Sequence, residues 1–476
     1  MLFTTGAFAV FFLIVLAVAR SGFVEGVWRK LFLLAASYYF YAALEWWFVV
    51  LLVASSVFNF AWGRLYLRLP QRLPHKRWQR LWLAGGVLGN LLLLGYFKYA
   101  GFFLDNIGDL SRAFGYEGAD WTVNVLLPVG ISFFTFQNLC YLLDIRREET
   151  EPSDHALDYF LYLAFFPQLL SGPIVRPNYF LNQLREPWKA DAEGFQRGLQ
   201  LVLLGFCKKV LLANVIGSQL VNPAFSQPEA FHPAFLLLAL YGFTIQLYLD
   251  LSGYTDIARG LARMLGYELP HNFDRPYAAT SVGNFWQRWH ITMSSFFRDY
   301  LFYALGGSRH GNVYFNVVVT FVAIGIWHGA GWNFVVYGLC HGSIVAFERY
   351  LVNRRRAHGL PAPVLMGWSY VWRVAYVFHF VTFSRVLFRG DSFAEAHDYL
   401  VSMLTAAGTA MPAVWMAYAA MAVAMIAHYT PVDWRERGHN LFRRLPSAVQ
   451  AGTGVALIYF GVAVSYEQAA FLYFQF

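Results

Sequence analysis

Long apolar runs recur along the whole chain, and no other feature restricts its fold as strongly. Segments 31–62, 81–103 and 233–253 are each long enough to cross a bilayer, since a spanning helix needs about 20 mainly apolar residues. Charged residues are only 13% of the 476 residues, roughly half the share found in soluble domains, so polar side chains cannot cover a water-facing surface. We therefore predict an all-α polytopic membrane protein with about 11–13 crossings, at roughly 30–40 residues for each crossing and loop.

The same numbers exclude several classes of protein. A soluble enzyme and a nucleic-acid-binding domain both need more charge than this chain carries. The formal net charge of +8 is attributed to basic cytoplasmic loops, which membrane proteins favour. The three cysteines lie far apart in apolar runs, so we predict no disulfide and no metal site.

Positive charges also predict the topology. Segment 64–80 holds six Lys or Arg residues and two prolines, and a short loop of this kind stays in the cytoplasm. Basic segments 353–356 and 433–444 predict two further cytoplasmic loops, and the resulting count places the C-terminus outside. No linker, repeat or low-complexity stretch is visible, so residues 1–476 are interpreted as one membrane domain.

Three segments are predicted to depart from simple crossings. Segment 31–62 is too long for one helix, and Glu45-Trp46-Trp47 interrupts it, so two helices joined by a tight turn are expected. Segment 159–170 is apolar but too short to span, which favours a re-entrant or interfacial piece. Segment 280–303 is amphipathic and interrupted, and we place it dipping in from the cytoplasmic side. The remaining predicted crossings are 2–19, 123–143, 198–216, 313–328, 333–346, 368–388, 412–428 and 447–466.

Polar residues inside apolar runs concentrate between residues 246 and 341. Ionisable groups are costly in lipid and usually face an interior or a wet cavity. His328 follows an apolar helical stretch and precedes Gly329, which predicts an imidazole at a helix end. An imidazole is well suited to deprotonate a hydroxyl near neutral pH. The alternative is a packing histidine bonded to a backbone carbonyl.

The other polar residues in this stretch have weaker functional readings. Asp250 shares a helix face with Gln246. Instead of a functional role, Asp250 and Asp256 could each have a structural one, in an ion pair with Arg259, Arg263 or Arg275 that locks helices together. His341 is expected to make a structural hydrogen bond. His290 lies beside Arg288 at a predicted boundary, where solvent could reach it. No Ser-nucleophile, phosphate-loop or metal-ligand motif appears, so the visible chemistry is proton transfer by histidine.

Six ordered motifs then resemble a known family. They are Leu-Pro-Val-Gly-Ile-Ser-Phe at 127–133, Pro-Gln-Leu through Gly-Pro-Ile at 167–174, Asp-Leu-Ser-Gly-Tyr-Thr-Asp at 250–256, Asn-Phe and Pro-Tyr at 272–277, Phe-Trp-Gln-Arg-Trp-His-Ile at 285–291, and Trp-His-Gly at 327–329. In this order the chain resembles the membrane-bound O-acyltransferases (MBOAT), specifically their AlgI-like, alginate O-acetyltransferase branch.

The resemblance implies a fold and a site. The fold would be an MBOAT-like ring of tilted helices with re-entrant segments around a central tunnel. His328 would be catalytic, and His290 would be a second catalytic histidine nearer the cytoplasmic entrance. Asp250, Asn284 and Trp327 would line or support the tunnel.

The resemblance also implies a reaction and its location. No cofactor would be bound permanently, and the acyl donor would be a cytoplasmic thioester, acetyl-CoA or an acyl carrier protein. The acceptor would be an exported polysaccharide such as alginate or cellulose, reached with periplasmic acetyltransferase partner proteins. The protein would then be a multi-pass protein of the bacterial inner (plasma) membrane, in contact with lipid and not with nucleic acid.

The chain ends in the aromatic segment 471–476, Phe-Leu-Tyr-Phe-Gln-Phe. One interpretation is an interfacial anchor, since aromatic residues settle at membrane surfaces. The segment is also similar to a tail of this family's export systems in which a tyrosine carries the acyl group. On that interpretation Tyr473 is an acyl relay.

Three alternatives to the polysaccharide acetyltransferase stay open. A proton-coupled transporter would also keep Asp250, Asp256 and His328 inside the membrane. A sister branch of the family exports D-alanyl groups to teichoic acids. A non-catalytic subunit of a polysaccharide export machine would need none of these residues for chemistry.

Overall fold

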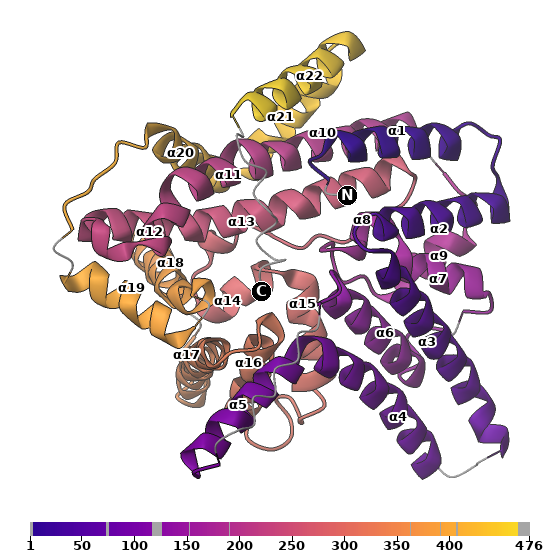
Figure 1. The fold of residues 1–476 in the computed structure, drawn as a ribbon, viewed down its shortest axis with the longest axis horizontal. Coiled ribbons are helices and arrows are strands. Elements are labelled where there is room, and N and C mark those ends of the chain that lie inside the picture. The colour runs from indigo at the N-terminus through magenta and orange to yellow at the C-terminus, as the bar shows by residue number, and fades with distance from the viewer. Residues whose placement is uncertain are drawn as a thin grey trace. The chain divides into compact units, whose positions relative to one another are not determined.

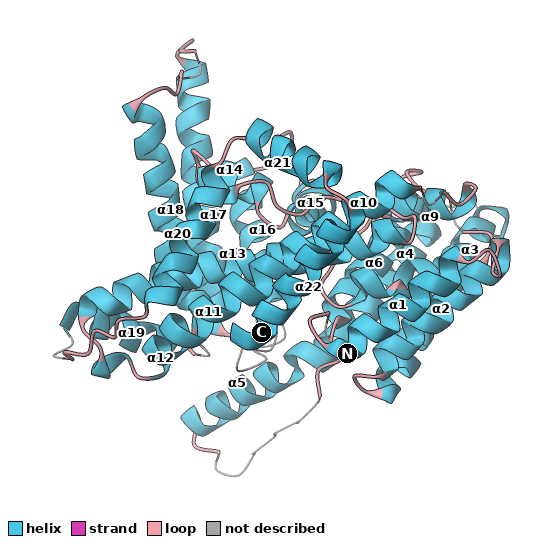
Figure 2. Ribbon diagram, turned by 90° about the horizontal axis from the view of Figure 1, so that it is seen from above, coloured by secondary structure: helices cyan, strands magenta, loops and turns pink. Residues whose placement is uncertain are grey.

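In the computed structural model, residues 3–72, 76–116, 126–151, 153–189, 191–361, 363–390, 392–405 and 408–464 are described. Helices make up this part of the chain (Figures 1 and 2), and one isolated bridge joins Phe231 to Ala410. Among the described residues, five helices are long and apolar enough to cross a membrane: Trp46–Arg68, Lys76–Ala113, Ala192–Ser226, Pro233–Met264 and Trp368–Arg389. The predicted all-α, multi-pass class is confirmed. The count of about 11–13 crossings stays a prediction.

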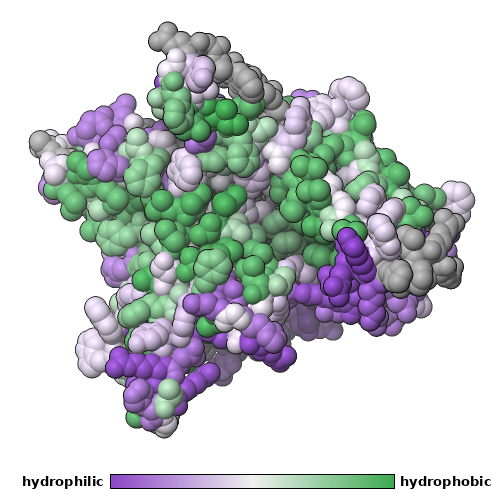
Figure 3. Space-filling model, turned by 90° about the horizontal axis from the view of Figure 1, so that it is seen from below, coloured by the Kyte–Doolittle hydropathy of each residue, from purple (hydrophilic) through white to green (hydrophobic). Residues whose placement is uncertain are grey.

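Large apolar side chains are exposed on the described surface. Examples are Phe23, Leu92, Trp368 and Ile426. On the face drawn in Figure 3, hydrophobic residues cover broad areas and hydrophilic residues gather in separate patches. A soluble protein rarely exposes apolar patches of this kind, and a lipid-facing surface requires them.

The chain divides into two compact units, each of which is described by itself. Unit 1 comprises Met1–Leu199 and Ala258–Pro270, and unit 2 comprises Gln200–Ile257 and His271–Phe476. The prediction of one membrane domain stays a prediction.

Unit 1 is built from the N-terminal helices. They are α1 (Gly6–Arg20), α2 (Gly26–Ala42), α3 (Trp46–Arg72), α4 (Lys76–Leu94), the π-helical η1 (Gly95–Tyr99), α5 (Ala100–Ala113), α6 (Ile131–Arg146), α7 (Ala156–Ala164), α8 (Phe166–Leu169), α9 (Pro177–Arg185) and the start of α10 (Ala192–Phe206). The predicted turn after α2 is present at residues 43–45. The predicted basic loop 64–80 is wrong in extent, because α3 continues to Arg72 and α4 begins at Lys76. Straight-chain Arg, Lys, Leu and Gln are good helix formers.

Two of the family-like motifs meet in unit 1. Gly130 precedes α6 with a φ of 83°, a left-handed conformation that favours glycine. A Cβ at this position would lie 2.6 Å from the carbonyl oxygen of Leu169, and Tyr41 donates a hydrogen bond to the carbonyl of Val129 (2.7 Å). The short helices α7 and α8 are buried, in agreement with the prediction that segment 159–170 is not a full crossing. These motifs therefore build packing contacts in unit 1.

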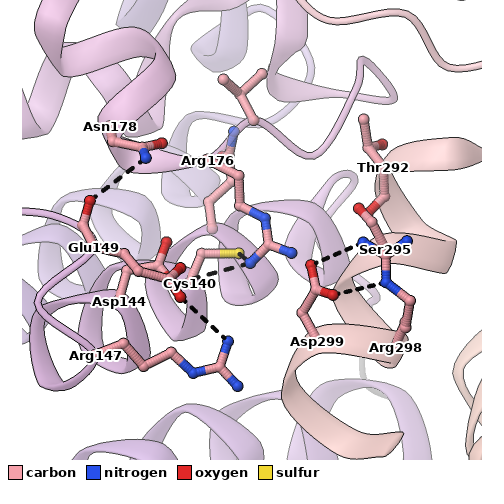
Figure 4. A network of polar contacts seen from close by, with 12 residues as sticks. Cys140, Asp144, Arg147, Glu149, Arg176, Asn178, Thr292, Ser295, Arg298 and Asp299 are labelled. Atoms are coloured by element: carbon pink, nitrogen blue, oxygen red, sulfur yellow. Dashed lines mark hydrogen bonds and ion pairs between the residues drawn. The ribbon is translucent and has the colours of Figure 1, made fainter. Parts of the chain in front are cut away.

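A polar cluster lies beside α6, as Figure 4 shows. The guanidinium of Arg176 lies 3.7 Å from the Cys140 sulfur and 4.0 Å from the Asp144 carboxylate. Asn178 donates to the backbone carbonyl of Glu149 at 3.5 Å. The charge of Asp144 is thus compensated inside unit 1.

Unit 2 contains the rest of the chain. Its elements are the end of α10, the π-helical η2 (Cys207–Ala213), α11 (Asn214–Ile216), η3 (Gly217–Val221), α12 (Asn222–Ser226), η4 (Pro228–Ala230), most of α13 (Pro233–Met264), η5 (Pro276–Ala278), α14 (Val282–Arg288), α15 (Ile291–Phe296), η6 (Phe297–Phe302), α16 (Val313–His328), α17 (Trp332–Ala357), α18 (Trp368–Arg389), α19 (Phe393–Thr405), α20 (Trp415–Tyr429), α21 (Val432–Arg444) and α22 (Ser447–Val464). Part of its core is an apolar cluster around Phe235, Leu240 and Tyr399.

The structure corrects several predicted boundaries in unit 2. Helix α13 runs on to Met264 instead of ending near residue 253, so Asp250 and Asp256 lie on one continuous helix. Helix α17 likewise continues to Ala357, past the predicted end at 346. Residues 433–444, predicted as a loop, lie in the helix α21, whose arginines, leucine and phenylalanine sustain an amphipathic helix.

Helices α16 and α17 approach each other closely through two glycines. A Cβ on Gly325 would collide with the carbonyl oxygen of Phe334, and a Cβ on Gly338 would collide with that of Phe321. Backbones can come this near only where no side chain intervenes, as in small-residue helix contacts of membrane proteins. This packing fixes the end of α16, where His328 lies.

Candidate histidine site

His328 is the last residue of α16, and its side chain is buried. The helix ends there because Gly329 takes an extended conformation, with φ −161° and ψ 158°. The imidazole packs edge-on against Phe388 of α18, with ring centroids 5.0 Å apart, and lies 6.3 Å from the ring of Tyr337 of α17. The predicted helix-end position is confirmed, and three helices contribute to the surroundings of the ring.

Trp327 places the two predicted histidines around one indole. Its ring centroid is 4.9 Å from that of His328 and 5.8 Å from that of His290, which it meets nearly at right angles. Trp327 and His328 are neighbours in sequence, so their side chains leave α16 in different directions. His290 reaches the indole from the segment between α14 and α15. The structure therefore brings His290, Trp327 and His328 together.

The backbone of His290 has an uncommon conformation. It begins α15 with φ 45° and ψ 55°, in the left-handed region that few residues other than glycine adopt. Two hydrogen bonds hold the next residues: Ile291 N–H to the Asn272 carbonyl (2.9 Å) and Thr292 N–H to the Asn272 side chain (3.1 Å). Such conformations persist only where surrounding contacts hold them, and they gather at functional sites.

Burial also sets the protonation state of His290. The side chain is 3% exposed, and this desolvation lowers the pKa of the imidazole to about 3. His290 is therefore neutral at physiological pH. The prediction that solvent might reach it as a boundary residue is wrong, because the loop carrying Asn272 and Phe273 packs against it.

His341 makes the structural hydrogen bonds expected of it. The indole N–H of Trp286 donates to His341 Nδ1 (3.1 Å), and His341 Nε2 lies 3.0 Å from the hydroxyl of Ser384. That hydroxyl donates to the carbonyl of Val381 at 2.8 Å. Since Nδ1 accepts, Nε2 carries the proton, and the chain of donors runs in one direction. His341 thus ties α14, α17 and α18 together.

Asp250 and Asp256 each form an ion pair with a lysine that the sequence analysis did not name. Asp250 forms a buried ion pair with Lys209, and Asp256 bonds Lys208 at 2.6 Å. Both lysines belong to the π-helical η2, whose wider turn changes which side chains face α13. The sequence signal was available, because two adjacent lysines interrupt an apolar run. The ion pair with Lys209 favours a structural role for Asp250. The expectation that Asp250 lines or supports a tunnel stays a prediction.

Asn284 lies apart from the histidines. Its side chain donates to Gln287 (3.2 Å) and accepts from Arg288 (3.0 Å). It also lines a pocket of about 1470 Å³ between α14, α16, α17 and α18, whose lining includes neither His290 nor His328. The Glu348 carboxylate at this pocket accepts the Val282 and Gly283 N–H groups at the start of α14.

Arg385 is a site residue that our sequence reasoning missed. It lies on α18 with 1% of its surface exposed, and its guanidinium is 5.9 Å from the Phe388 ring that packs on His328. The signal was an arginine inside the predicted apolar crossing 368–388, which is rare in lipid and usually functional.

Two predicted features remain open. Tyr473 and the segment 471–476 lie outside the described residues. Within the described residues, no three His, Cys, Asp or Glu side chains gather in a way that could hold a metal ion.

The fold and the histidine site define a multi-pass membrane protein with buried imidazoles at a helix end. Residues 122–388 match the model of the MBOAT, membrane-bound O-acyltransferase family, and the chain belongs to this family. The predicted class, a membrane-bound O-acyltransferase, is thereby confirmed. The matched region contains His290, Trp327, His328 and Arg385.

Individual relatives carry the comparison further. The chain is 36% identical over 300 residues to the probable alginate O-acetylase AlgI of Azotobacter vinelandii, covering 63% of this chain and 59% of that protein. It is 32% identical over 387 residues to a peptidoglycan O-acetyltransferase of Helicobacter pylori, covering 75% and 70%. A teichoic acid D-alanyltransferase of Bacillus subtilis is 28% identical over 294 residues, covering 58% and 71%. The match thus spans less than two thirds of the Azotobacter relative.

Proposed function

We propose that this protein transfers an acetyl group from a cytoplasmic thioester to a hydroxyl group, for O-acetylation of an exported polysaccharide such as alginate or cellulose. The observation that carries the proposal is the meeting of His290, Trp327 and His328 in the region matched to the family. The named alginate and peptidoglycan O-acetyltransferases support acetyl transfer to an exported polymer. Because the chain is also similar to a D-alanyltransferase, the experiment below must distinguish transfer of an acetyl group from transfer of another small acyl group.

His328 serves as the general base. It takes the proton of the attacking hydroxyl while the oxygen bonds to the thioester carbonyl carbon, and the carbonyl electrons move onto its oxygen. When this tetrahedral intermediate collapses, the carbon–sulfur bond breaks and protonated His328 returns the proton to the leaving thiolate. The products are an O-acyl ester and a free thiol. Base catalysis of this kind contributes about 10²–10⁴-fold to a rate.

His290 acts through Trp327. Because burial keeps its pKa near 3, it remains neutral, and its ring fixes the indole against which His328 packs. The donor is acetyl-CoA or an acyl carrier protein, and neither is permanently bound.

Tyr473 is the acceptor of the first transfer. Its phenol ester would be a better acyl donor than an alkyl ester, so onward transfer to the glycan by periplasmic partner proteins would be downhill. On this proposal the protein lies in the bacterial inner membrane, with its donor inside and its acceptor outside.

A mass spectrum of the peptide containing Tyr473 tests the proposal. Wild-type protein, His328→Gln and Tyr473→Phe are each incubated with acetyl-CoA without partner proteins, and thiol release is measured in the same samples. We expect a 42-dalton adduct on Tyr473 in wild-type protein alone, roughly the mass that an acetyl group adds to a hydroxyl. Thiol release without the adduct would exclude the relay, and no thiol release with either class of thioester would contradict acyl transfer itself.

A further inference from the structure

Arg385 carries a buried charge whose hydrogen-bonding edges have no partner in the described residues. The side chain is 1% exposed, and both its Nε and one terminal nitrogen are fully enclosed without a hydrogen bond among those residues. Burying a charge costs several kcal/mol unless it is paired and hydrogen-bonded. A buried charge without hydrogen bonds is tolerated where a bound ligand supplies the missing acceptors, or where other contacts offset the cost of desolvation.

Aromatic rings cover the faces of the guanidinium but cannot satisfy its edges. Its central carbon lies 4.3 Å from the ring centre of Trp289 and 5.9 Å from that of Phe388. Cation–π contacts contribute less than the desolvation of the ion costs. The guanidinium has five N–H groups to donate, and the two rings offer no oxygen acceptor for them.

Acidic side chains of the same unit are engaged elsewhere. The carboxylates of this unit with described partners are Asp250 on Lys209, Asp256 on Lys208, Asp274 near Arg275 and Arg288, Asp299 on Arg298, Asp398 beside His397, and Glu348 on the start of α14. None of these pairs includes Arg385. The described residues thus provide no hydrogen-bond acceptor for Nε and one terminal nitrogen of Arg385, which leaves these donors available to a ligand.

The position of Arg385 relates it to the histidine site. Phe388 touches both the guanidinium and the ring of His328, which lie 5.9 and 5.0 Å from its centre. Trp289, the other stacking partner, directly precedes His290. Burial raises the pKa of the nearby Tyr277 phenol, and the positive charge of Arg385 opposes that rise. The field of the arginine thus reaches the aromatic residues around the site.

We propose that Arg385 is a further catalytic residue, which donates hydrogen bonds in the plane of its guanidinium to the acyl carbonyl oxygen as that oxygen becomes negative. This inference rests on the proposed acyl transfer. A fixed cation in a water-excluded site stabilises a developing oxyanion far more than the same cation would in water. The donors are needed most in the transition state, so removing them should lower kcat with little change in KM.

Kinetics in proteoliposomes with acetyl-CoA as the probe test the assignment. We expect Arg385→Gln to lower kcat about 10²–10³-fold, the loss typical of one oxyanion donor, with KM for acetyl-CoA within about threefold of wild type. Arg385→Lys, which keeps the charge but loses the planar fork, should fall between. Arg389→Gln is the matched control, because this arginine lies one turn further along α18 over the ring of Phe225, and it should turn over like wild type.

A second readout separates catalysis from folding. A trifluoromethyl ketone analogue of the acyl thioester forms a tetrahedral adduct, and its inhibition constant should weaken in parallel with kcat across the Arg385 variants. A thermal melt identifies any variant that fails to fold, in which case Arg385→Lys carries the comparison. A folded Arg385→Gln with wild-type kcat, or with unchanged inhibition by the ketone, would overturn the assignment. A wild-type protein that consumes no donor would instead overturn the proposed function.

Discussion

Two groups of ionisable residues lie inside the apolar helices of unit 2, and they are built differently. Between η2 and α13, each charge has an opposite charge: Lys209 with Asp250 and Lys208 with Asp256. At the end of α16, the rings of Trp327, Tyr337 and Phe388 pack around His328. Ion pairs that compensate each other hold helices together, whereas an imidazole is suited to proton transfer.

The largest effect should come from His328. His328→Gln should lower the rate of thioester consumption about 10²–10⁴-fold with little change in thermal stability, because the glutamine keeps a similar volume. His341→Gln is the comparison, since it removes an imidazole bonded to Trp286 and Ser384. It should cost about 1–3 kcal/mol of stability instead. If His328→Gln and His341→Gln lost the same activity and melted at the same temperature, the assignment of a catalytic role to His328 and a structural role to His341 would be wrong.

The ion pairs should show the reverse behaviour. Asp250→Asn leaves the buried Lys209 without its carboxylate and should destabilise the protein by about 3–5 kcal/mol. The pair of Lys208 and Asp256 is more exposed, so Asp256→Asn should cost about 1 kcal/mol or less. Thermal unfolding in detergent measures both. An Asp250→Asn variant as stable as wild type but unable to consume donor would place Asp250 in the chemistry.

The contact between α16 and α17 offers a smaller, indirect test. Gly325→Ala puts a methyl group against the carbonyl of Phe334, which should cost about 1–3 kcal/mol and lower turnover by moving His328. Gly438→Ala is the matched control, because no atom of the described residues lies within 4 Å of a Cβ there. Melting curves and donor consumption are compared for both variants. Wild-type values for Gly325→Ala would show that the close approach does not position the site.

The least direct test is a pH dependence of stability from His290. Its folded pKa is about 3 against about 6.5 when unfolded, so the unfolded state binds more protons between these values. Stability from this group is complete above about pH 6.5 and falls as the pH drops, by at most about 1.4 kcal/mol per unit. The difference in melting temperature between wild type and His290→Gln should therefore change from pH 7 to pH 5. A constant difference would contradict the buried, neutral state.

The sequence predicted the helical class, the family and the helix-end position of His328 because each depends on local pattern. Apolar runs indicate crossings, and the glycine that follows His328 favours a helix end there. It did not predict that Lys208 and Lys209 pair with α13, because a π-helical turn shifts the side chains. It also could not show that His290 and His328 share one indole, since that contact joins residues 37 positions apart through a left-handed backbone turn. Arg385 was visible in the sequence, but its stacking rings were not.

Donor consumption by two variants tests the central claim most directly. One is His328→Gln, and the other is the double variant Lys209→Met with Asp250→Val, which replaces a buried ion pair by apolar side chains closer to the originals in volume. Such replacements are often neutral or stabilising. We predict thioester consumption close to wild type in the double variant and a loss of about 10²–10⁴-fold in His328→Gln. Consumption that persists in His328→Gln and disappears in the folded double variant would contradict the account.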